Sequence, residues 1–312
     1  MSVSDLKTAG FLILVLVGTA TFLLGTQLPG DSRLMLSLQD SGHFLIFTLL
    51  MLALLWPYRN SPRPPVWPLV SLVLLFGLLV ELVQSLIGRQ PSLYDLLMDL
   101  LGVAAGGILF LGLFKRSLSP GLGLAVAALL ALAAFSLPIY WLIVYQARAA
   151  DFPQLINTDG SISNALIKGS RGGVVRRIAV EEDWRIPMEL GVKSCLYVSL
   201  QEGRWPGVSL FEPSPDWGGY RVLALTLYSD RADELTLTLR INDRNHNKQP
   251  EDRYSRRFTL HPGINRISVP LDEVEDAPEG RSMDLSAISK LMLFASPAYT
   301  GSGFCLLSME LR

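Results

Sequence analysis

The sequence has 312 residues, of which 50% are hydrophobic and 18% are charged, and its mean hydropathy of +0.35 is high for a soluble protein of this size. The charge is uneven: residues 1–147 hold 7 Lys/Arg and 6 Asp/Glu, whereas residues 148–312 hold 20 and 22. Because neither half is strongly basic, the composition argues against nucleic acid as a partner, and it predicts a membrane half joined to a soluble half.

The first half contains five apolar runs, and a transmembrane helix needs about 20 such residues. The runs are 8–28, 43–57, 66–87, 92–114 and 119–145. The first run is interpreted as an uncleaved span, since no small-x-small cleavage site follows it. An α-helical membrane bundle of about five transmembrane helices is therefore expected over residues 1–147.

The orientation of these spans follows from Lys and Arg in the short loops, which favour the cytoplasmic side. The loops after the second and fourth runs each carry two cations, whereas those after the first and third carry only Arg33 and Arg89. This places the N-terminus in the cytoplasm. Five crossings of a bacterial inner membrane then place the C-terminal domain outside the cytoplasm, in the periplasm or its equivalent.

Polar residues within the predicted spans recur at helical spacing, so each set lies on one helix face. Ionisable side chains in a membrane usually face the bundle interior. At a rise of about 1.5 Å per residue, the ionisable side chains of the third and fourth runs lie at similar depths below the outer ends of their helices. We therefore expect one outward-opening cluster, made of Asp40, His43, Glu81, Gln84, Arg89, Asp95 and Asp99.

These residues stand in ordered motifs: Asp40-Ser-Gly-His43-Phe44, Glu81-Leu-Val-Gln84, Gly88-Arg89 and Asp95-Leu-Leu-Met-Asp99-Leu-Leu-Gly102. Over about residues 8–115 the sequence resembles the VanZ-like family of bacterial membrane proteins. Asp99 departs from that family, where Asn is usual, and Phe47 stands where Tyr is common. The resemblance implies a cell-envelope protein associated with glycopeptide antibiotic resistance and identifies no reaction.

Two interpretations of the cluster stay open. It is either a set of interhelical hydrogen bonds and ion pairs that fixes the bundle, or a site for a lipid-linked sugar or phospholipid head group. In the second case Arg89 would hold an anion, and His43 with Glu81 or Asp95 would handle protons. One His among oxygen ligands identifies no particular metal, so neither a metal nor a cofactor is predicted.

The second half shows short alternating runs typical of half-buried antiparallel strands. A linker is expected over 148–183 and a domain over 184–312. The absence of intervening helices predicts an all-β jelly-roll sandwich. The expected strands are 195–200, 208–211, 221–228, 234–241, 254–260, 264–269, 289–295 and 303–311.

The segments Asp216-Trp-Gly-Gly-Tyr220, Asn242-Asp-Arg-Asn-His246, Pro262-Gly-Ile-Asn265 and Arg281-Ser-Met-Asp-Leu285 resemble galactose-binding-like jelly rolls of the carbohydrate-binding-module type. The resemblance implies glycan contacts, with core aromatics and a solvated loop as the alternative. Glu310 in the last strand leaves a structural calcium in doubt, and Lys248 and Tyr254 exclude an EF-hand. The candidate contacts are Trp205, Trp217, Tyr220, Asp243, His246, Asp252 and Arg253.

Cys195 and Cys305 are the only cysteines, and they fall in the first and last of these strands. An oxidising compartment permits a disulfide between them, whereas free buried cysteines are also common in apolar strands.

Three hypotheses of function remain. The outer domain binds an envelope polysaccharide or a membrane-protein partner, or the membrane cluster acts on membrane lipids as an enzyme or transporter, or the chain is purely structural. Catalysis is therefore an open question.

Overall fold

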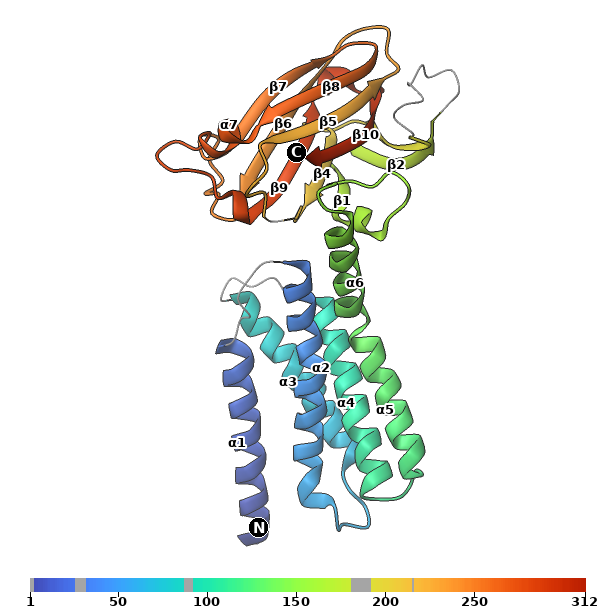
Figure 1. Ribbon diagram of the computed structural model, residues 1–312. Coiled ribbons are helices and arrows are strands. Elements are labelled where there is room, and N and C mark those ends of the chain that lie inside the picture. The colour runs from blue at the N-terminus through green and yellow to red at the C-terminus, as the bar shows by residue number, and fades with distance from the viewer. Residues whose placement is uncertain (1–2, 26–31, 87–91, 181–191, 215) are drawn as a thin grey trace. The chain divides into compact units, whose positions relative to one another are not determined.

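The computed structural model describes residues 3–25, 32–86, 92–180, 192–214 and 216–312. It divides into two compact units, Met1–Leu142 and Ile143–Arg312. The first unit is helical and the second is built from strands (Figure 1).

The helical unit contains several apolar helices, four of which are long and apolar enough to cross a membrane. Serine side chains accept backbone N–H groups at the first turns of α2, α4 and α5, which caps donors that lack a helical partner. The helices are α1 (Val3–Gly25), α2 (Arg33–Leu55), α3 (Val66–Leu86), α4 (Leu93–Leu113), α5 (Pro120–Ala134) and α6 (Ser136–Asp151), with a 3₁₀ turn, η1, at Trp56–Tyr58.

The fifth predicted span is two helices, α5 and α6, which meet at Phe135 with a bend of 50°. Pro138 explains the break, because its ring has no N–H to donate to the carbonyl of Ala134 and clashes with that carbonyl in a continuous helix. Counted as one bent span, the pair gives a fifth candidate crossing.

Glycines let α2 and α4 approach closely. A Cβ added at Gly102 would lie 2.5 Å from the carbonyl oxygen of Phe44, and one added at Gly106 would lie 2.6 Å from that of Thr48. Such small residues are typical of helix contacts inside membranes. The spacing of these glycines therefore sets how near Asp99 comes to α2.

The second unit is an antiparallel sandwich of two five-stranded sheets, with orders β1-β4-β9-β6-β7 and β2-β3-β10-β5-β8. Most connections cross from one sheet to the other, as in jelly rolls. The strands are β1 (Ile167–Ser170), β2 (Gly173–Ala179), β3 (Ser194–Leu200), β4 (Gly207–Phe211), β5 (Val222–Ser229), β6 (Leu235–Asp243), β7 (Tyr254–Leu260), β8 (Gly263–Pro270), β9 (Ile288–Ala295) and β10 (Gly303–Leu311). The short helix α7 (Leu271–Glu275) follows β8.

The expected linker 148–183 is wrong over its second part, because β1 and β2 lie within it and belong to the two sheets. Residues before β1 are also tied to the sandwich. The Leu155 N–H donates to the carbonyl of Met309 in β10, and Leu311 N–H donates to that of Pro153. The sequence around β1 contains Lys, Gly and Ser and lacks apolar alternation, which explains why the pattern did not indicate a strand there.

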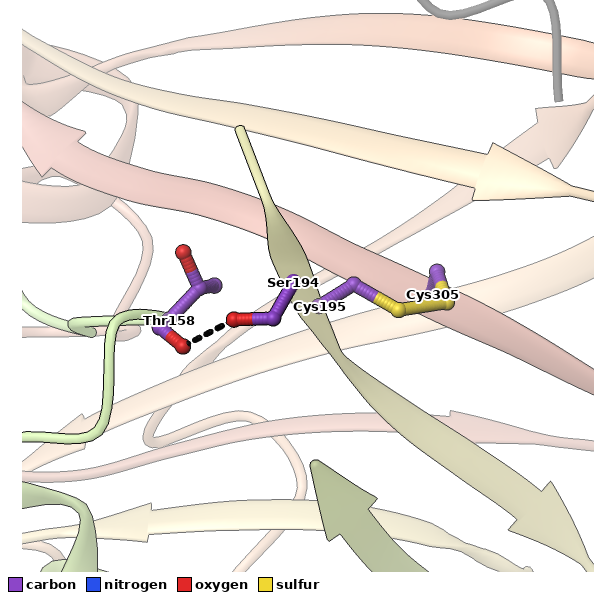
Figure 2. Close-up of a disulfide and its surroundings, with 4 residues drawn as sticks. All are labelled: Thr158, Ser194, Cys195 and Cys305. Atoms are coloured by element: carbon purple, nitrogen blue, oxygen red, sulfur yellow. Dashed lines mark hydrogen bonds between the residues drawn. A yellow bond between two sulfur atoms is a disulfide. The ribbon is translucent and has the colours of Figure 1, made fainter. Parts of the chain in front are cut away.

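Alternating apolar residues of both sheets form the core of the sandwich, where Leu223, Leu237 and Phe304 are fully buried. A disulfide joins Cys195 of β3 to Cys305 of β10, with Cα atoms 5.7 Å apart. Figure 2 shows this disulfide beside Ser194, whose hydroxyl donates to the carbonyl of Thr158. The segment before β1 is therefore attached to β3 as well as to β10.

Candidate functional site

Two places in the chain gather the residues singled out by the sequence. The first lies inside the helical unit, where the Nδ1 atom of His43 on α2 lies 2.9 Å from Oδ1 of Asp99 on α4. Asp40 and Asp95 interact with each other and with His43. With Glu81, the structure thus brings five of the seven predicted cluster residues together in one electrostatic group.

Glu81 belongs to the same group and is 4% exposed. Its Oε2 accepts the N–H of Ser92 at 3.1 Å, whereas Oε1 has no hydrogen-bond partner among the described residues. Glu81 also lines a cavity of about 330 Å³ that is otherwise walled mainly by leucines of α3 and α4. A buried carboxylate oxygen without a partner is unfavourable, so this carboxyl group is suited to receive a donor from a bound molecule.

The two remaining members of the predicted cluster are Gln84 and Arg89. The amide of Gln84 donates to the carbonyl of Leu23 at 3.2 Å, so it links α3 to α1. Arg89 lies outside the described residues.

The second place is the outer face of the sheet β1-β4-β9-β6-β7, called here the β9 face. In β6 the leucines are buried, whereas Thr238 and Arg240 between them are half-buried and point away from the core. The strand register places Arg240 opposite Met292 of β9, and Asn242 opposite Lys290. The β9 face therefore carries polar and cationic side chains at its centre.

Aromatic rings lie at both ends of β9 on this face. Near its end, Phe294 packs edge to face against Trp205, with ring centroids 6.0 Å apart, and Trp205 is 40% exposed. Near its start, the ammonium group of Lys290 lies 4.4 Å from the centre of the Phe211 ring. Exposed aromatic faces beside hydrogen-bonding groups can bind molecules with one apolar and one polar side.

Two of the predicted contact residues are instead committed to an internal ion pair. Arg281 makes a bidentate contact with Asp243, at 2.6 and 2.9 Å, and donates its Nε–H to Asp252 at 2.5 Å. Burial alone would raise the pKa of Asp243, but the hydrogen bonds from Arg281 and the Asp284 N–H outweigh it and lower that pKa below 3.8. The prediction that Asp243 and Asp252 contact a ligand is wrong, since both are almost fully buried around Arg281.

Hydrogen bonds from the Arg281 Nε–H and from the backbone N–H of Asn247 likewise lower the pKa of Asp252. Both carboxylates are therefore ionised at neutral pH, and both are held by Arg281.

His246 is also engaged within the sandwich. Its Nε2 lies 3.0 Å from Nη2 of Arg240, and its Nδ1 lies 2.6 Å from the carbonyl oxygen of Asp252. Because a guanidinium group only donates, Nε2 accepts and Nδ1 carries the proton. A neutral His246 thus orients Arg240 rather than contacting a ligand with either nitrogen.

The predicted aromatic contacts divide in the same way. Trp217 is fully buried and belongs to the core, so its assignment as a glycan contact is wrong. Tyr220 packs edge to face on Phe152, with centroids 5.3 Å apart. Among the predicted contacts, Trp205 and Arg253 remain as the two that reach the β9 face, since Arg253 immediately precedes β7 and neighbours Arg240.

Sequence reasoning missed Arg171, Lys290 and Phe294. The signal that could have found two of them is the alternation in 288–295, where Lys290, Met292 and Phe294 occupy the outward positions. Arg171 follows β1, which the pattern did not indicate at all.

No family model matches the chain, and no curated protein matches it. Solved structures similar to it include the family 11 carbohydrate-binding module from Clostridium thermocellum in complex with a β-1,3-1,4-mixed-linked tetrasaccharide, with 14% identity and a TM-score of 0.33, over 46% of this chain and 86% of that chain. An exo-β-agarase is 14% identical with a TM-score of 0.37, over 47% and 23%. The sandwich fold is established here by its strand order and register.

Proposed function

We propose that the chain is a multi-span membrane protein of the bacterial envelope whose β-sandwich binds a glycan outside the cytoplasm. The observation that carries this proposal is the β9 face, where the exposed Trp205 ring and Phe294 share one side of the sheet with Arg240 and Lys290. A sugar ring presents an apolar face of C–H groups and an edge of hydroxyls, and the β9 face offers a partner for each.

The helical unit supports the membrane part of the proposal. Four of its helices are long and apolar enough to span a bilayer, and α5 with α6 supplies a fifth. Large apolar side chains are exposed on these helices, including Leu14, Leu49 and Leu129, which is expected of lipid-facing surfaces. The distribution of Lys and Arg in the loops favours a cytoplasmic N-terminus, so an odd number of crossings would carry the sandwich outside.

The proposal is tested with the full chain in detergent, by a screen of envelope polysaccharides followed by calorimetry. We expect Trp205→Ala to weaken binding about tenfold, because a stacked aromatic ring contributes roughly 1 kcal/mol beyond its buried area. Trp67→Ala is the matched control, since Trp67 is an exposed Trp of α3 in the other unit. Lack of binding by the unaltered chain to every polysaccharide, or unchanged binding by Trp205→Ala, would contradict the proposal.

A second candidate function rests on Glu81. Its Oε1, which has no partner in the part of the chain that the structure describes, lies beside an apolar cavity of about 330 Å³. This favours an enzyme or transporter that acts on a lipid head group bearing a hydrogen-bond donor. Mass spectrometry of lipids retained by the purified chain tests this. The Glu81→Gln variant should lose a lipid that the unaltered chain retains. The control variant Ser71→Ala, at an exposed position on the same helix, should retain that lipid. Equal lipid retention by both variants would remove this candidate.

A further inference from the structure

Six cationic side chains lie on or around the β9 face. Arg240 and Lys290 occupy outward positions at its centre, and the other four come from β1, from the turn after it, and from β7 and the residue before it. The four are Lys168, Arg171, Arg253 and Arg257. Together, the six cations come from four of the five strands of this sheet or from residues next to them, so the positive charge is spread over the sheet.

None of these six cations forms a salt bridge among the described residues. Within the described ranges, Arg240 bonds only to the neutral His246, and the Nε atoms of Arg240 and Arg253 have no hydrogen-bond partner. Arg281 neutralises one of the two nearby carboxylates, Asp243 and Asp252, so that one negative charge is left beside the six cations. Among the described residues, the positive charge of the β9 face therefore exceeds the carboxylate charge that Arg281 leaves beside it.

The pKa values of the side chains at the centre of the β9 face also reflect an excess of positive charge. Burial and the charges of Arg253 and Arg171 together lower the pKa of Arg240 to about 10. Burial, Arg240 and Arg171 likewise lower the pKa of Lys290. Like charges held this close repel each other, and a bound anion would relieve that repulsion.

We propose that the ligand of the β9 face is an acidic polysaccharide, one whose repeating sugars carry carboxylate or phosphate groups. This inference rests on the proposed glycan-binding function and names the class of glycan. The separation of the cations across several strands fits a polymer with regularly placed charges better than a single small anion. The aromatic pair of Trp205 and Phe294 at the end of β9 supplies a stacking surface for a sugar ring, which a phosphate alone does not use.

The charge of the polymer is the variable that the experiment isolates. The full chain is reconstituted in phosphatidylcholine nanodiscs, and its binding is measured to polygalacturonate, to the methyl ester of the same polymer, and to poly(glycerol phosphate) teichoic acid. We expect binding to at least one of the two acidic polymers, about tenfold or more above the ester, and a decline as sodium chloride is raised, because salt screens exposed charges.

Variants then assign the binding to this face. Arg240→Gln and Lys290→Gln should each weaken binding to the acidic polymer about tenfold, since each removes a charge-assisted hydrogen bond. Arg266→Gln, an exposed cation on β8 of the opposite sheet, should bind as the unaltered chain does. Matching melting temperatures among the three variants confirm that each retains the fold.

Each other outcome has a separate meaning. Equal binding of the acidic polymer and its methyl ester would overturn the inference and leave glycan binding in place, whereas no binding of any polymer would overturn both. Binding to phosphatidylglycerol vesicles that exceeds binding to the polymers, and that is lost in Lys290→Gln, would replace the polysaccharide with an anionic lipid surface. Equal loss of binding in Arg266→Gln would also overturn the inference, because it would indicate attraction by the overall charge.

Discussion

The imidazole Nδ1 of His43 and the carboxylate Oδ1 of Asp99 lie 2.9 Å apart, and this contact joins α2 to α4 inside the helical unit. Both side chains are buried, at 8% and 2% exposure. Asp99 is also held against α3, because a Cβ on Gly77 would lie 2.6 Å from its Oδ2. Three helices therefore meet at one carboxylate, and this meeting point can be tested by substitution.

The first prediction concerns Asp99. Asp99→Ala leaves His43 buried without its partner, and we expect the helical unit to lose about 1 kcal/mol of stability, a typical net contribution of one hydrogen bond. Asp99→Asn keeps an acceptor of the same size and should lose less. Unfolding by sodium dodecyl sulfate in mixed micelles measures both. Equal stability of Asp99→Ala and the unaltered chain would show that the contact contributes nothing.

The second prediction concerns the close approach of α2 and α4. Gly102→Ala forces a methyl group against the carbonyl of Phe44, and overpacking of this kind destabilises by roughly 1–3 kcal/mol. Gly107 on the same helix has open space around its Cα, so Gly107→Ala should be neutral or slightly stabilising because Ala favours the helix. The melting temperatures in detergent distinguish the two, and an equal fall in both would contradict this helix contact.

The third prediction concerns Arg281. Removal of this side chain in Arg281→Met leaves the buried Asp243 and Asp252 as neighbouring uncompensated carboxylates, which is strongly unfavourable. We expect the sandwich to melt several degrees lower. Arg312→Met is the control, because Arg312 pairs with Glu310 at an exposed position and surface pairs contribute little. A melting temperature within error of the control would contradict the role assigned to Arg281.

The fourth prediction is a dependence of stability on pH. The pKa values of Asp243 and Asp252 are lower in the folded chain than their ordinary value of 3.8. A carboxyl group whose pKa is lower in the folded chain stabilises the fold at any pH above its pKa in the unfolded chain. That stability is lost as the pH falls through 3.8 toward the pKa values of the folded chain. Unfolding at pH 5 and pH 2.5 should show this loss. Arg281→Met should show a smaller acid effect, since its carboxylates no longer gain from ionisation.

The fifth prediction concerns the disulfide. The bridge closes a segment with a sequence separation of 110 residues, and a loop of this length restricts the unfolded chain strongly. The double variant Cys195→Ala/Cys305→Ala should lose about 2–4 kcal/mol of stability to urea. A reducing agent should lower the stability of the unaltered chain and leave the double variant unchanged. Two free thiols in the unaltered chain by mass spectrometry would contradict the bridge.

The sequence predicted most of the strands because apolar residues alternate along them. Each of the eight expected strands begins and ends within about two residues of an observed strand. The two missed strands, β1 and β2, are rich in Gly, Ser and Arg and stay half-exposed at sheet edges. The pattern of apolar residues reports burial, so an edge strand with little burial leaves a weak signal.

The candidate sites were harder to predict, because polar residues that stand close in sequence can serve unlike purposes. Asp243, His246 and Asp252 share one stretch with Arg253, yet three of them bond within the protein and Arg253 reaches the β9 face. The partner that decides their role is Arg281, which is separated from Asp243 by 38 positions. Helical periodicity served better for the cluster in the helical unit, because it places Asp40 with His43 on one face of α2 and Asp95 with Asp99 on one face of α4.

The position of β1 and β2 at the edges of the two sheets has a practical consequence for anyone who isolates the sandwich. A fragment that begins at residue 184 would remove both edge strands at once and expose β3 and β4, whose residues are mostly buried and apolar. Such bare strands recruit strands from other molecules, so the shortened protein would aggregate. A fragment that begins at Ile143, the first residue of the second unit, retains both edge strands and is the appropriate starting point for soluble expression.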